Sequence, residues 1–255
     1  MSHPDKRKQA QLGFTMAELL IGMALSLLVI AAATAAYGTS KQTWNAMAAA
    51  DAVHANARIA LRNIREQSLA AGAAYLKATS NSDGRFSVEV SDNEDLGQAA
   101  LAGVNGSKYV GSLTLGHWHA IDDIDCQGNA SSTHSTVGNH YKLNTNKELT
   151  CKDLNLNNST YQALAEGVED FQVRYAEAHP VAQTVQWKTA NQVTAMSQVI
   201  AIEVCLVVAS SMANNHTPSS VSLKGCQGET MANDGRARRT FKRVMALRNR
   251  IDVMP

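Results

Sequence analysis

The most apolar part of the chain lies near its N-terminus, where residues 13–33 read GFTMAELLIGMALSLLVIAAA. From Leu19 to Ser40 no residue is charged and none is proline. As a helix this stretch spans roughly 33 Å, about the thickness of the hydrocarbon core of a bilayer. The pattern predicts a membrane-spanning helix with one carboxylate, that of Glu18, near its beginning.

The helical pattern continues beyond the uncharged run. Apolar residues recur every three or four positions between residues 53 and 64, and arginines recur on another face. This predicts one helix of about 60 residues, from Phe14 to near Gly72, whose second half packs an apolar stripe against a globular part. The stripe consists of Val53, Ala57, Ala60, Leu61 and Ile64.

After residue 78 the chain becomes rich in Asn, Ser, Gly and Asp, and its hydrophobic pattern weakens. Residues 85–90 (RFSVEV) and 109–116 (YVGSLTLG) are typical of short strands. Residues 117–160 are polar with little periodicity, and we expect them to be mostly loop.

Strand patterns return in the C-terminal third. Phe171, Val173 and Tyr175 alternate with polar residues, and Val199 to Val208 is nearly continuous apolar sequence, as in a central strand. The last segment places Phe241, Met245 and Leu247 on one side. A long helix followed by antiparallel strands predicts an α+β fold, with one sheet wrapped on the second half of the helix.

Charge indicates an orientation but no polyanionic partner. The 255 residues carry a net charge of +1, so overall charge does not suggest nucleic-acid binding. The short leader before the apolar run holds three basic residues, at 6–8, and one acid, Asp5. The positive-inside rule keeps this end cytoplasmic and sends the globular part across the membrane.

Two ordinary explanations of the N-terminus fit incompletely. A cleaved secretory signal has a shorter apolar region and an A-x-A-like site, and no such site clearly follows this run. A plain membrane anchor explains the length and the orientation but not Glu18, because a carboxylate at membrane depth is costly.

The stretch GFTMAE, with its basic leader and long apolar helix, resembles the N-terminal signal of type IV pilins and pseudopilins. The resemblance implies that prepilin peptidase cuts between Gly13 and Phe14 and methylates the new terminal amine. It also implies that Glu18 pairs with the amino terminus of a neighbouring subunit. Residues 1–13 would be the leader, 14–40 the membrane and filament-core half of the helix, and 41–255 the periplasmic domain, with the remainder of the helix.

Three later segments resemble the C-terminal strands of the PilW family of minor pilins: 164–178, 199–210 and 238–250. The implied function is a non-enzymatic subunit that helps to prime and assemble a type IV pilus with other minor pilins and the major pilin, from the bacterial inner membrane. One alternative is a J-like pseudopilin of type II secretion. Another is an adhesin or DNA-binding subunit that uses the pilin export route.

Four cysteines, Cys126, Cys151, Cys205 and Cys226, lie in the part expected to be exported. An even number in an oxidising compartment indicates two disulfides, for which three pairings exist. The sequential pairs would each close a loop of about 20–25 residues and stabilise the fold by about 3 kcal/mol. A buried free thiol at Cys205 is the alternative.

No motif indicates an enzyme, a cofactor or a metal site. Zinc ligation by Cys with His117, His119, His134 or His140 lacks the usual ligand spacing. The run DDIDCQGN imitates a calcium loop through Asp123 and Asp125, but its twelfth position is His134 where a glutamate is needed. The basic C-terminal run from Arg236 to Arg250 is expected to face water or a neighbouring subunit, and we do not expect it to bind nucleic acid.

Overall fold

The computed structural model describes residues 13–73, 76–80, 86–90, 101–105, 111–119, 124–130, 135–156, 158–179, 182–213, 223–231 and 233–249. The chain divides into two compact units, residues 1–47 and 48–255. The leader and the last residues, with Arg250, lie outside the described part.

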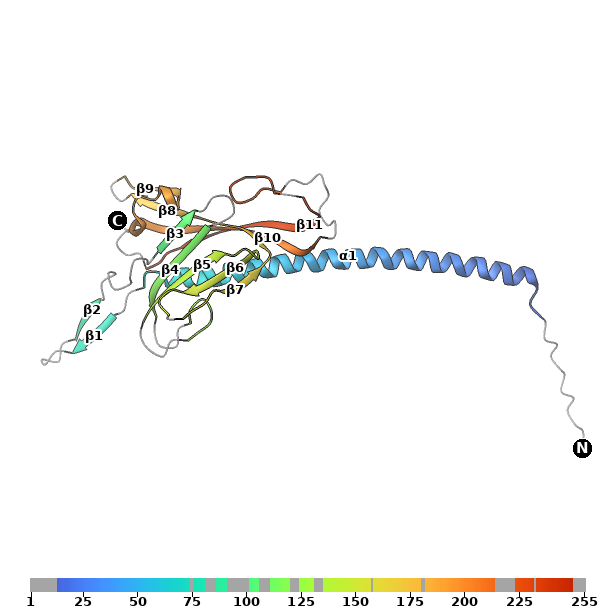
Figure 1. Cartoon of the computed structure of the whole chain (residues 1–255), viewed down its shortest axis with the longest axis horizontal. Coiled ribbons are helices and arrows are strands. Elements are labelled where there is room, and N and C mark those ends of the chain that lie inside the picture. Colours follow the sequence, from blue (N-terminus) through green and yellow to red (C-terminus); the bar gives the residue numbers. More distant parts are fainter. Residues whose placement is uncertain are drawn as a thin grey trace, which may run out of the picture. The chain divides into compact units, whose positions relative to one another are not determined.

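Helix α1 runs without interruption from Met16 to Ala70 (Figure 1). The predicted stripe is confirmed: Val53, Ala57, Ala60, Leu61 and Ile64 are all buried. Small alanines in this stripe allow the backbone of the helix to approach the sheets closely. The helix ends at Ala70, and Gly72 follows with a φ of 79°, a left-handed conformation that glycine adopts without strain.

The strands of the second unit form three antiparallel sheets, not the single sheet that we expected. A five-stranded sheet has the order β3-β4-β5-β6-β7, a four-stranded sheet has the order β11-β10-β8-β9, and β1 pairs with β2. The bounds are β1 Leu76–Ser80, β2 Phe86–Val90, β3 Leu101–Asn105, β4 Gly111–His119, β5 Ser135–Leu143, β6 Glu148–Asp153, β7 Gln162–Glu166, β8 Val168–His179, β9 Thr184–Thr189, β10 Val199–Ala213 and β11 Arg236–Ala246. Two 3₁₀ turns, η2 at Ala190–Gln192 and η3 at Met196–Gln198, join β9 to β10.

One hydrophobic core joins the second half of α1 to both larger sheets. It contains the buried stripe of the helix, Leu113 and Leu149 of the five-stranded sheet, and Phe171 and Leu206 of the four-stranded sheet. Gly167 connects the two sheets between β7 and β8, with a φ of 71°. The sequence-based expectations for residues 85–90, 109–116 and the three C-terminal strands are confirmed.

The expectation that residues 117–160 are mostly loop is wrong, because β5, β6 and the end of β4 lie there. The core-facing positions of β5 include Asn139, which is fully buried although it is polar. Its amide interrupts the apolar alternation, so the strand was not recognisable from hydropathy.

Candidate functional site

The N-terminal segment begins as irregular backbone at Gly13, and Phe14 is almost fully exposed. Thr15 precedes the first helical residue and forms a capping box with Glu18. The Thr15 N–H and hydroxyl donate to Glu18 Oε2 at 2.9 and 3.0 Å, and the Glu18 N–H donates to Thr15 Oγ1 at 3.3 Å. These bonds satisfy backbone groups that the helix leaves free. Glu18 therefore has a local partner in this structure.

The sequence analysis missed this local role of Glu18. The signal was readable, because Thr15 and Glu18 have the S/T-x-x-E spacing of a capping box directly before an apolar run. A capping box does not require a charge, since glutamine serves at the same position. The capping role and a charge-pairing role of Glu18 can thus be separated by experiment.

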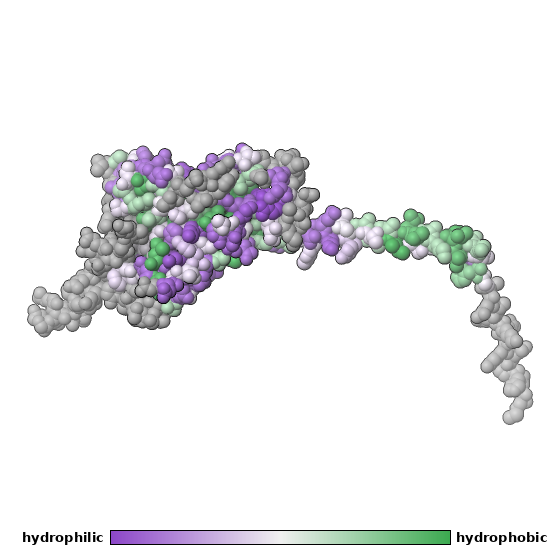
Figure 2. All heavy atoms as spheres, viewed as in Figure 1, coloured by the Kyte–Doolittle hydropathy of each residue, from purple (hydrophilic) through white to green (hydrophobic). Residues whose placement is uncertain are grey.

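The first unit exposes its apolar side chains. Leu19, Leu27 and Val29 are 53%, 67% and 68% exposed, and the helix is long and apolar enough to cross a membrane. Figure 2 shows this part of α1 as predominantly hydrophobic. Near its start, Gly22 and Ser26 lie one and two turns after Glu18 and line a shallow groove of about 360 Å³. Small residues at such spacing allow another helix to approach closely.

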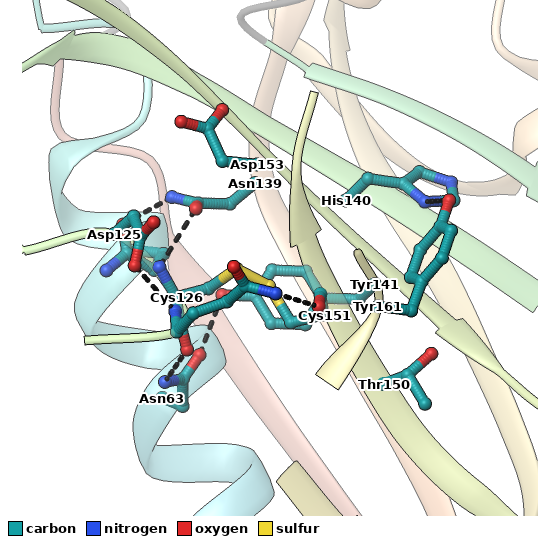
Figure 3. The surroundings of a disulfide bond; sticks show 12 residues. Asn63, Asp125, Cys126, Asn139, His140, Tyr141, Thr150, Cys151, Asp153 and Tyr161 are labelled. Carbon is teal, nitrogen blue, oxygen red and sulfur yellow. Dashed lines mark hydrogen bonds between the residues drawn. A yellow bond between two sulfur atoms is a disulfide. The ribbon is translucent and has the colours of Figure 1, made fainter. Parts of the chain in front are cut away.

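In the second unit, buried amides fasten α1 to the five-stranded sheet (Figure 3). Asn63 Nδ2 donates to the Cys126 carbonyl at 3.0 Å, and the Tyr141 hydroxyl donates to Asn63 Oδ1 at 2.8 Å. Asn139 Nδ2 donates to Gln67 Oε1 at 2.7 Å, and its Oδ1 accepts the Cys126 N–H at 2.9 Å. We call these five residues the helix–sheet junction. It fixes one register of the helix against the sheet.

The structure joins the cysteines in the two sequential pairs. Cys126 is linked to Cys151 with their Cα atoms 6.3 Å apart, directly beside the helix–sheet junction. Cys205 of β10 is linked to Cys226, with 5.8 Å between their Cα atoms. The second disulfide holds the segment 223–231 over the outer face of the four-stranded sheet.

Part of the basic C-terminal run is used inside the fold. Arg236 and Arg238 both pair with Glu169 and with Asp234, and Lys147 also pairs with Glu169 at 2.8 Å. Burial raises the pKa of Glu169, but the bonds from Arg238 and Lys147 outweigh it, so the pKa lies below its ordinary value. These arginines therefore stabilise the domain and are engaged by its own carboxylates.

The remaining basic side chains lie nearer the surface. Arg239 contacts His54 of α1 at 3.1 Å, and Lys242, Arg243 and Arg248 are exposed. This agrees with the expectation that the rest of the run faces water or a neighbouring subunit.

The side chains considered for metal binding are dispersed or engaged. Asp125 accepts hydrogen bonds from the N–H groups of Gln127 and Asn129, at 2.8 and 2.9 Å, and thereby closes a turn. Asp123 and His134 lie outside the described residues. Within the described ranges, no three potential ligands group together.

Comparison with known proteins identifies the C-terminal half. Residues 135–249 match the family model of type IV pilus-assembly protein W, which confirms the resemblance to the PilW family. The matched segment contains β5 to β11. Among solved structures, a type IV-like pilin from Thermus thermophilus is similar at 16% identity and a TM-score of 0.37, over 58% of this chain and 84% of that one. No curated protein matches the chain.

Proposed function

We propose that this chain is a minor pilin, a structural subunit without catalytic activity that takes part in priming and assembling a type IV pilus. The match to type IV pilus-assembly protein W supports a role in the pilus. The observation that carries the proposal is the exposed apolar half of α1, because such a surface requires a cover of lipid or of other helices. A pilin uses both covers, first in the inner membrane and then in the filament.

In this proposal, prepilin peptidase cleaves between Gly13 and Phe14 and creates a new α-amino group beside Glu18. In a dry setting an ammonium and a carboxylate each carry a large desolvation penalty, and pairing offsets it. The groove beside Gly22 and Ser26 gives a neighbouring helix room to approach Glu18. The partners are other minor pilins and the major pilin, and the domain after the membrane segment faces the periplasm.

Processing is tested by mass spectrometry of the chain from cells with active prepilin peptidase. We expect the protein to begin at a methylated Phe14. Replacing Gly13 by leucine should leave the 13-residue leader in place. A wild-type chain that begins at Met1 in such cells would contradict the proposal.

The role of Glu18 is tested by comparing Glu18→Ala with Glu18→Gln. Glutamine can still accept the Thr15 hydrogen bonds of the capping box but carries no charge. If charge pairing primes assembly, both variants should be processed normally and should form few pili, and deleting the retraction motor should partly restore the number. Surface pili per cell are counted with and without the motor.

The control distinguishes the local role of Glu18 from the assembly role. Normal pilus numbers with Glu18→Gln would show that capping alone suffices and that charge pairing is not required. Normal numbers with both variants would contradict a priming role that depends on Glu18.

A further inference from the structure

The outer face of the four-stranded sheet contains a hollow of about 420 Å³, within the range of small-molecule sites. Side chains of three adjacent strands line it: Arg174 of β8, Glu203 of β10 and Lys242 of β11. Gln227 and Gly228 also line it, from the tip of segment 223–231.

The segment at the rim is held in place by its own bonds. Lys224 and Thr230 form an antiparallel bridge, and the Gly225 N–H donates to the Glu229 carbonyl at 2.9 Å. The disulfide from Cys226 to β10 ties this turn to the sheet. The hollow therefore has a braced rim, which lowers the entropic cost of ordering a binding site.

Gln172 also lines the hollow and contains an unsatisfied acceptor. Its side chain is 5% exposed, and its Nε2 donates to Asp170 Oδ1 at 3.1 Å. The other Asp170 oxygen accepts the Cys226 N–H at 3.0 Å, so Asp170 is an acceptor on both sides and sets the orientation of the amide. Gln172 Oε1 is left without a donor. Buried acceptors are rarely unpaired, so this oxygen calls for a hydrogen-bond donor from outside the chain.

The charged groups of the hollow specify further properties of a ligand. Arg174 and Glu203 lie 3.5 Å apart, with the Arg174 side chain half exposed. Lys242 makes no ion pair with any residue in the described ranges, so these three side chains leave one positive charge unbalanced. Trp187 of β9 is 38% exposed beside the hollow, with its ring centre 6.0 Å from the Arg174 guanidinium carbon.

We propose that this hollow binds a uronic-acid residue of an acidic polysaccharide. Sugar hydroxyls both donate and accept, so they can donate to Gln172 Oε1 and Glu203 and accept from Arg174. The sugar carboxylate balances Lys242. An apolar ligand would leave Gln172 Oε1 unpaired, and a simple anion would bring no donor to it. This inference concerns the second unit alone and does not depend on processing at Gly13.

The test uses the full-length chain in detergent micelles and titrates it with trigalacturonate by calorimetry, with lactose and acetate as comparison ligands. We expect trigalacturonate to bind and the other two to bind at least tenfold more weakly. Gln172→Met removes the acceptor at similar size, and Lys242→Ala removes the charge from an exposed position. Each should weaken binding at least tenfold.

Arg243→Ala is the matched control, because Arg243 neighbours Lys242 on β11, is exposed and does not line the hollow. It should change affinity by less than twofold. The absence of trigalacturonate binding at millimolar concentration would overturn the proposal, as would an equal loss with Arg243→Ala. Equal affinity for lactose or for acetate would also overturn it, since the carboxylate or the sugar would then be irrelevant.

Discussion

A buried carboxylate, Glu177 of β8, holds the connection between β9 and β10 against the sheet. The Glu177 side chain is fully buried, and it accepts the Lys188 ammonium at 2.6 Å. The N–H groups of Thr194 and Ala195 donate to the same carboxylate at 3.1 and 2.8 Å, and the Thr194 hydroxyl also donates to it. We call this arrangement the Glu177 clasp.

The strength of the clasp follows from the pKa of Glu177. Burial raises this pKa, but the bonds from Lys188, Thr194 and Ala195 outweigh burial and lower it from 4.5 to about 2. At about 1.4 kcal/mol per pH unit, the difference corresponds to about 3 kcal/mol in favour of the ionised carboxylate. Because the pKa is lower in the folded state, this stabilisation is present above pH 4.5 and is lost as the pH falls toward 2.

We expect Glu177→Gln to lower the free energy of unfolding at pH 7 by about 3 kcal/mol, because it leaves the largely buried Lys188 ammonium without its counter-charge. The variant should also lose less stability than the wild type between pH 5 and pH 3. The measurement is urea unfolding of the full chain in detergent at pH 7, 5 and 3, followed by tryptophan fluorescence. Trp187 directly precedes Lys188 in the chain and reports on this region.

Glu66→Gln is the control, since Glu66 and Arg62 form an exposed pair on α1 and should contribute less than about 1 kcal/mol. The reasoning about the clasp would be refuted if Glu177→Gln changed stability no more than this control. It would also be refuted if the wild type and Glu177→Gln lost stability in parallel between pH 5 and pH 3.

Three further predictions concern the fold. Non-reducing peptide mapping should recover both sequential disulfides, and Cys126→Ser should lower the free energy of unfolding by about 2–5 kcal/mol. Gly167→Ala should cost about 1–3 kcal/mol in urea unfolding, because the φ of 71° disfavours alanine and the new Cβ would lie 2.3 Å from a carbonyl oxygen of β10. Asn63→Leu should cost about 2–4 kcal/mol by leaving a buried hydroxyl and a carbonyl unpaired, whereas the exposed Arg62→Ala should stay within about 0.5 kcal/mol.

The sequence was sufficient for the parts of the fold that follow one hydrophobic period. The helix and its stripe from Val53 to Ile64 repeat at helical spacing, and the core of β10 is continuously apolar. It was insufficient for β5 and β6, where Asn139 and Thr150 are buried although they are polar. Hydropathy cannot identify a buried polar residue whose partners lie on distant segments, because its burial depends on those partners.

The same limit applies to the candidate sites. The cleavage and assembly residues Gly13, Phe14 and Glu18 are contiguous, so one short motif sufficed to propose them. Glu177 and Gln172 have no such motif, since the donors of Glu177 and the braced rim beside Gln172 belong to other elements. Only the folded chain brings these groups together.

The helix–sheet junction explains how one helix serves two units. Alanines of the stripe, such as Ala57 and Ala60, pack closely but differ little from their neighbours in shape, so alone they specify the position along the helix weakly. Asn63 and Gln67 remove this ambiguity, because sliding the helix by one turn would leave their buried partners unpaired. In the proposed pilin, assembly forces act on the membrane half of α1 and must reach the domain through its second half. Buried amides then resist slippage where an apolar stripe alone would allow it.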